Sequence, residues 1–213
     1  MGVQMSDKPY RPRTHTQDDG TSLKGGSKFE DSPVVNFLFE HFSHLLDSPV
    51  RRLFNDPVRT LEAAGVQPGL EVLEVGCGTG YFTVHAAEMV GDGGTIHAFD
   101  IHLAAVEETS KKIRQARQDN VKLTKTDALD TSLLDRSYDL ILLFGVIPAP
   151  VLPLNKLLPE MHRLLKEGGS MAVWTGLPLW SPRHITRSGL FIHIRKRNGV
   201  HTFKNAGRQD SVR

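Results

Sequence analysis

One stretch of the sequence, residues 71–83, limits what this chain can fold into more than any other. It begins as a short apolar run, has glycine at the alternate positions Gly76, Gly78 and Gly80, and continues with apolar residues at helical spacing from Phe82 to Val90. This pattern predicts a strand, a tight turn and a helix. Glycine can take positive φ angles and has no Cβ to keep a ligand away from the main chain. The turn is therefore expected to hold a flat or extended ligand against bare peptide.

The residues around the glycines separate the ligands that such a turn can hold. The dinucleotide fingerprint G-x-G-x-x-G needs a third small residue where this chain has Tyr81, and this disfavours NAD. Glu74, two residues before the first glycine, would repel a pyrophosphate and attract a cation. The stretch resembles motif I of the class I S-adenosylmethionine (SAM) dependent methyltransferases, whose ligand carries a sulfonium and an ammonium and no phosphate. A plain strand-turn-helix core and a different nucleotide are the alternatives.

Later positions extend the resemblance from about residue 60 to residue 175. Asp100 ends a predicted second strand, 20 residues after Gly80, where a carboxylate can accept hydrogen bonds from both ribose hydroxyls. Thr126-Asp127-Ala128 follows the third strand, where a side-chain acceptor and a backbone amide can read an adenine edge. The runs Tyr138 to Ile141 and Leu164 to Gly169, with the Gly145 turn between them, also match the family.

The resemblance implies how this chain would hold the methionine part of SAM. Gly76, Gly78 and Gly80 would pass close to it, Glu74 would lie near its ammonium, and the carbonyl of Phe144 would face it.

For the nucleoside part, the resemblance implies four further residues. Asp100 would bind the ribose, Ile101 would cover one adenine face, and Asp127 with Ala128 would read the adenine edge. All nine residues follow or end predicted strands, where open α/β sheets bind ligands.

Alternation of strands and helices after residue 70 predicts an α/β fold: a Rossmann-like, mostly parallel, seven-stranded sheet. Strands are expected at 71–75, 95–99, 121–123, 138–144 and 171–174. A helix is expected at about 103–117, and another near 157–165 ends at Gly168-Gly169, with Pro159 in its first turn or kinking it. An antiparallel hairpin, 190–194 with 200–203, turns at Asn198-Gly199.

The domain boundaries follow from composition and from helix-start signals. Residues 1–30 lack apolar periodicity and are expected to be a flexible tail, and 208–213 a second one. Between them lies a single methyltransferase domain, 31–207, with N-terminal helices at 31–65, a SAM-binding core at 70–175 and the terminal hairpin at 188–206. Helix starts at Ser32-Pro33, Ser48-Pro49 and Asp56-Pro57 define the N-terminal helices, which are expected to pack on the sheet or roof the cleft.

Composition restricts the partners and the compartment. The net charge of +2 does not by itself indicate a nucleic-acid partner. The charge is unevenly placed, however, because residues 183–213 contain eight Lys or Arg residues and a single acid, Asp210. The only cysteine, Cys77, allows no disulfide framework and no multi-thiolate metal site, so no metal is expected. No apolar stretch reaches the roughly 18 residues of a membrane span. We expect a cytoplasmic protein of unassigned oligomeric state.

The reaction that the resemblance implies is in-line transfer of a methyl group to a small-molecule acceptor. No catalytic residue is assigned, because alignment of the reactants can suffice. Amino-methylating relatives carry Asn or Asp, Pro-Pro and an aromatic residue after the fourth strand, where this chain has Gly145 to Pro150, so a base amine is disfavoured as acceptor. Acceptor recognition is expected from residues 33–64, 145–154 and 176–188. A methyltransferase of RNA or protein, and a non-catalytic SAM-binding subunit of a larger complex, remain alternatives.

Overall fold

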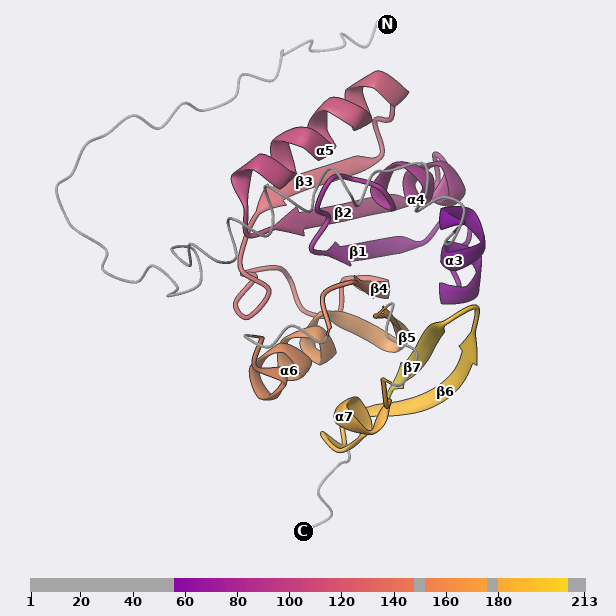
Figure 1. Cartoon of the computed structure of the whole chain (residues 1–213), viewed down its shortest axis with the longest axis vertical. Helices are drawn as coiled ribbons and strands as arrows, with labels where there is room; N and C mark the ends of the chain where they lie inside the picture. The colour runs from indigo at the N-terminus through magenta and orange to yellow at the C-terminus, as the bar shows by residue number, and fades with distance from the viewer. Residues whose placement is uncertain (1–55, 148–151, 176–179, 207–213) are drawn as a thin grey trace, which may run out of the picture.

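Seven strands form one mixed sheet at the centre of the computed structural model, which describes residues 56–147, 152–175 and 180–206 (Figure 1). The strand order is β3-β2-β1-β4-β5-β7-β6. The strands are β1 (Glu71–Val75), β2 (Thr95–Asp100), β3 (Val121–Lys125), β4 (Tyr138–Phe144), β5 (Leu165–Trp174), β6 (Phe191–Arg197) and β7 (Val200–Asn205). The helices are α3 (Pro57–Ala64), α4 (Thr83–Val90), α5 (Leu103–Ala116), α6 (Leu154–Leu164) and α7 (Arg183–Thr186).

Strands β1 to β5 are parallel, and only β7 runs against its neighbours β5 and β6. The predicted fold class is therefore confirmed. The chain order reverses between β1 and β4, so the carboxyl ends of these two strands flank a topological switch point, where open α/β sheets bind ligands. None of the helices in the described ranges is long and apolar enough to cross a membrane.

Each face of the sheet buries its own apolar core. On one face, α3 and α4 cover side chains such as Val72, Ile96 and Leu142. On the other face, α6 and α7 cover Leu73, Ile141 and their neighbours. Burial on both faces explains why β4 reads as a continuous apolar run, since a central parallel strand has no solvent-facing side.

Helix α3 begins and ends where the sequence predicts. Asp56 Oδ1 accepts hydrogen bonds from the amides of Val58 and Arg59, at 3.0 and 3.3 Å, and Gly65 ends the helix in the left-handed conformation (φ 96°). Its buried residues Leu61 and Ala64 pack into the core, so this helix packs on the sheet. The two helices predicted before it lie outside the described residues.

The hairpin prediction is confirmed in its turn and extended in its length. Asn198 and Gly199 both have positive φ, 48° and 77°, as a tight two-residue hairpin turn requires. Strand β6 continues to Arg197 and β7 to Asn205, beyond the predicted ends at residues 194 and 203. One further residue, Ile194, forms a bulge between the pairs His193 with Phe203 and Arg195 with Thr202.

The boundary between α6 and β5 differs from the prediction. The helix does not continue to Gly168-Gly169, because Leu165 already pairs with Tyr138 and begins the strand. The pairing register then shifts before Leu140, and Gly168 takes a positive φ of 71° within the irregular part. The two glycines thus shape the start of β5. Pro159 lies inside α6, beyond its first turn.

The crossover from β3 to β4, residues 126–137, contains no helix. Parallel strands are usually joined through a crossover helix that packs on the sheet. Here polar contacts with α6 hold the segment instead, as described below.

Candidate functional site

The glycine turn after β1 lies against the end of β2. The amides of Gly76 and Cys77 both donate to the carbonyl oxygen of Phe99, at 2.8 and 3.0 Å. All three glycines have positive φ angles, of 74°, 55° and 76°. The turn leads into α4, as the spacing of the glycines predicts.

The three glycines have different surroundings. A Cβ on Gly76 would stand 2.9 Å from Cγ2 of Val146, and one on Gly80 would stand 3.1 Å from the Cα of Thr109. A Cβ on Gly78 would meet no described atom within 4 Å. Gly76 and Gly80 therefore allow close packing, and Gly78 faces open space.

Asp100 organises the turn from the end of β2. Its Oδ2 accepts a hydrogen bond from the amide of Gly78, and its Oδ1 accepts one from the amide of His102, both at 3.0 Å. The side chain is 8% exposed. Each carboxylate oxygen has a second acceptor position, so the predicted ribose contact is compatible with this structural role.

Glu74 is a buried acid beneath the turn. It is 2% exposed, and its Oε2 makes no hydrogen bond with any described residue. Burial raises its pKa from 4.5 to about 8, the neighbouring Thr83 hydroxyl lowers it, and the charge of Asp100 raises it further. The Thr83 hydroxyl likewise makes no hydrogen bond of good geometry with another described residue. Without a cation beside it, Glu74 is therefore mostly protonated at neutral pH.

Thr109, on α5, closes the other side of the turn. Its hydroxyl lies 3.0 Å from the carbonyl oxygen of Gly78, to which it donates, and 3.6 Å from Sγ of Cys77. Cys77 is buried and free, and burial together with the charge of Glu74 raises the pKa of its thiol. A thiol held protonated is a poor nucleophile, so Cys77 serves packing.

The predicted nucleoside-binding residues lie next to Asp100. Ile101 follows it directly and is half-buried, and the amide of Thr126 donates to the Asp100 carbonyl at 3.0 Å. Oδ1 of Asp127 accepts the amide of Leu129 at 2.9 Å, while Ala128 packs against the core under α6. The ends of β2 and β3 thus bring these residues to one edge of the sheet.

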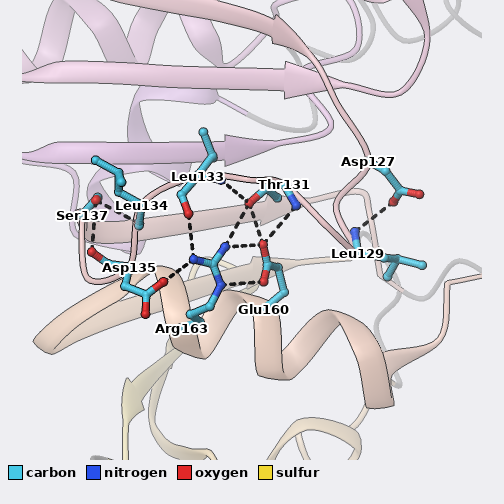
Figure 2. Close-up of polar contacts among 9 residues, drawn as sticks. All are labelled: Asp127, Leu129, Thr131, Leu133, Leu134, Asp135, Ser137, Glu160 and Arg163. Carbon is cyan, nitrogen blue, oxygen red and sulfur yellow. Dashed lines mark hydrogen bonds and ion pairs between the residues drawn. The ribbon is translucent and has the colours of Figure 1, made fainter.

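Side chains of α6 hold the segment that carries Asp127 (Figure 2). Glu160 Oε1 accepts both the amide and the hydroxyl of Thr131, at 3.1 and 2.6 Å. Arg163 binds both carboxylate oxygens of Glu160, at 2.6 and 2.9 Å, and also contacts the carbonyl oxygen of Leu133 and the carboxylate of Asp135. We call Thr131, Glu160 and Arg163 the crossover clamp. The hydrogen bonds from Arg163 lower the pKa of Glu160 to about 2.

Phe144 ends β4 beside aromatic neighbours. Its ring lies 4.8 Å from that of Phe82, which lies 6.3 Å from that of Trp174 at the end of β5. The next amide, of Gly145, donates to the Trp174 carbonyl at 2.8 Å. The loop beyond, and the segment after β5, are predicted acceptor regions, and residues 148–151 and 176–179 lie outside the described residues.

Sequence reasoning missed Thr109 and the crossover clamp as contributors to this edge. It assigned Val146 to acceptor recognition and did not foresee its packing against Gly76. Glu160 and Arg163 are visible in the sequence as an i,i+3 pair on a predicted helix, but their partners in the crossover are 28 or more residues away. No group of three or more potential metal ligands occurs among the described residues.

The strand order with its single reversed strand, and the glycine turn at the switch point, are those of the class I SAM-dependent methyltransferases. The chain belongs to the methyltransferase domain family, whose model matches residues 67–194.

Individual relatives agree with this assignment. Demethylmenaquinone methyltransferases from Geobacillus sp. and Staphylococcus aureus are 30% and 34% identical to this chain over 113 and 112 residues. These alignments cover 53% and 52% of this chain, and 47% and 45% of the relatives. The chain thus spans about half the length of the curated relatives it matches.

Solved structures share the fold. A SAM-dependent methyltransferase from Aquifex aeolicus matches with a TM-score of 0.64 and 22% identity, over 78% of this chain and 96% of that one. One described as an S-adenosyl-L-methionine-dependent methyltransferase from Methanococcus maripaludis matches with a TM-score of 0.62 and 17% identity, over 82% and 94% of the two chains.

Proposed function

We propose that this chain binds SAM at the carboxyl ends of β1 to β4 and transfers its methyl group to a small-molecule acceptor. The observation that carries the proposal is the buried Oε2 of Glu74, which has no described partner and lies beneath a glycine turn with open space at Gly78. A buried carboxylate oxygen without a partner is costly. The ammonium group of SAM would supply the missing charge and hydrogen bond.

The remaining residues fit the other parts of the cofactor. Gly78 would come closest to the methionine part, with Gly76 and Gly80 maintaining the turn and the Phe144 carbonyl facing it. Asp100 would accept the ribose hydroxyls through its remaining lone pairs.

At the base, Ile101 would cover one adenine face. Asp127 and Ala128 would read its edge, held in place by the crossover clamp.

When bound, SAM would supply the methyl group of its sulfonium to the acceptor. The rest of the cofactor would leave as S-adenosylhomocysteine, and the acceptor would lose a proton to solvent or to a base. The residues of this chain would align the acceptor and exclude water. Such alignment can contribute roughly 7–11 kcal/mol to lowering the barrier. A short-chain demethylmenaquinone in its quinol form is the first acceptor to test, because relatives of about 30% identity are named for that compound.

Calorimetric titration with SAM, S-adenosylhomocysteine and NAD tests the cofactor. We expect micromolar binding of the two sulfur compounds and none of NAD. Asp100→Asn should weaken the binding, whereas Asp119→Asn, an exposed acid in the turn before β3, is the matched control. If neither SAM nor S-adenosylhomocysteine binds, the proposal is refuted.

Transfer of labelled methyl from SAM to the quinol tests the acceptor class. Binding of SAM without transfer to any small molecule would favour the non-catalytic subunit, and transfer to RNA or protein would favour the macromolecular alternative.

A further inference from the structure

The outer edge of the sheet, formed by β6, combines positive charge with exposed apolar side chains. Residues 180–206 contain six Lys or Arg residues and no Asp or Glu. All six cations are exposed. Ile192 and Ile194, on the outermost strand, are 56% and 53% exposed. Figure 1 shows β6 at the edge of the sheet opposite β3 and α5.

Pairing between β6 and β7 places several of these residues on one face. Ile192 pairs with Lys204, Arg195 with Thr202, and Arg197 with Val200. Directly paired residues project from the same face of a sheet, and Val200 belongs to the core under α3 and α4. These residues therefore lie on the face of the sheet that α3 covers. We define the β6 patch as the exposed residues of this face together with the bulged isoleucine: Ile192, Ile194, Arg195, Arg197 and Lys204.

The cations of the patch make few polar contacts with described residues. Nη2 of Arg195 donates to the Ala63 carbonyl at 3.3 Å, and Nζ of Lys204 donates to the Gly168 carbonyl. Neither contact neutralises a cation. Arg197 has no ion pair among the described residues. The patch therefore keeps its positive charge.

Protection of an exposed strand edge does not explain the patch. Cations and a bulge do prevent edge strands from pairing with other chains. Two half-exposed isoleucines on the same strand act in the opposite direction, because they make the edge adhesive. Exposed isoleucines beside cations are instead typical of a surface that another surface covers.

We propose that the β6 patch docks on an anionic lipid bilayer surface. Aliphatic side chains that enter the headgroup boundary, flanked by cations that attract anionic lipids, are what interfacial binding requires. A hollow of about 340 Å³ beside the patch, which Arg195 and Lys204 line, also contains Asp139 and Glu167. These carboxylates would repel a small anion inside the hollow. A flat anionic surface would instead contact the exposed cations of the patch.

Two other partners fit the observations less well. Single-stranded RNA is bound by stacking bases on exposed aromatic side chains, and the aromatic residues of this hairpin, Phe191 and Phe203, are buried. A second copy of the chain paired through β6 would place two strands side by side that each carry the exposed cations Arg195, Lys196 and Arg197.

Co-sedimentation of the full chain with vesicles tests the proposal without SAM or turnover, so its outcome is separate from that of the proposed function. The vesicles are phosphatidylcholine alone, or phosphatidylcholine and phosphatidylglycerol in equal parts. We expect binding only to the anionic vesicles, and loss of binding as salt rises from about 0.05 to 0.5 M.

Two pairs of substitutions separate charge from apolar contact. Arg197→Gln with Lys204→Gln should weaken vesicle binding about 25-fold, since each cation near the surface contributes about fivefold. Ile192→Ser with Ile194→Ser should weaken it about tenfold, with an unchanged salt dependence. Lys111→Gln with Lys122→Gln, on α5 and on the opposite edge strand, is the control and should bind as the wild type does.

Circular dichroism verifies that each variant is folded. Absence of binding to anionic vesicles would overturn the proposal, as would equal binding by all the variants. RNA binding or β6-dependent dimerisation, found in place of vesicle binding, would overturn it in favour of those partners.

Discussion

Replacing Glu74 by Gln should stabilise the unliganded protein by an amount that grows with pH. The substitution removes an acid whose pKa burial raises from 4.5 to about 8. A group with a raised pKa in the folded state favours folding most below its unfolded pKa and loses that contribution as pH rises towards the folded pKa. Over this interval each pH unit is worth about 1.4 kcal/mol. The free energy of unfolding of the wild type should therefore be lower than that of Glu74→Gln by about 1 kcal/mol at pH 5 and by about 3 kcal/mol at pH 7.

Urea denaturation of both proteins at pH 5, 6 and 7 measures this difference. Gln keeps the shape of the side chain and cannot ionise, so the pH dependence of the difference reports the Glu74 carboxyl. Asp119→Asn is the control and should show no such widening. A difference in the free energy of unfolding that stays constant between pH 5 and 7 would refute the reasoning.

The same carboxyl predicts proton release when SAM binds. At pH 7 most Glu74 side chains are protonated in the free protein, and an ammonium beside them would favour the ionised form. Titration of SAM in buffers of different ionisation enthalpy should therefore show release of about one proton. In Glu74→Gln the release should disappear and the affinity should fall.

Three further predictions follow from contacts of the glycine turn and the crossover clamp. Gly80→Ala should lower the free energy of unfolding by about 3 kcal/mol in denaturant titrations, because its methyl group would press on the backbone of Thr109 in a positive-φ conformation. Gly78→Ala should cost only about 1 kcal/mol of stability, but should weaken SAM binding in calorimetry, because its methyl group would occupy open space on the ligand side; equal binding by the two alanine variants would contradict this. Arg163→Met should lower the free energy of unfolding by about 2–3 kcal/mol at pH 7. In denaturant titrations below pH 4.5 this difference should shrink, because the stabilising effect of the Glu160 charge is lost as pH falls towards its folded pKa of about 2.

How far the sequence predicted the fold depended on how local each signal was. The Asn198-Gly199 turn, the cap of α3 by Asp56 and the strand before Gly76 depend on neighbouring residues, and all are found where expected. The start of β5 depends on pairing of Leu165 with Tyr138, which is 27 residues earlier in the chain. Only assembly of the sheet decides that boundary.

The candidate site divides in the same way. The residue types and spacing identified Glu74 and Asp100, but not that Oε2 of Glu74 lacks a described partner or that Asp100 already binds the amide of Gly78. Both properties come from the close approach of β1, β2 and α4. The assigned roles of the nine predicted residues stay predictions until a ligand is bound.

The crossover between β3 and β4 has a consequence for which changes this chain can accept. The clamp holds it from Thr131 to Asp135, because Glu160 binds Thr131 while Arg163 binds the Leu133 carbonyl oxygen and the Asp135 carboxylate. Between these held residues the side chain of Leu134 is 81% exposed. Substitutions of Leu134 should therefore be tolerated without displacing Asp127. The outer surface of the crossover can thus change while the edge that carries Asp127 stays the same.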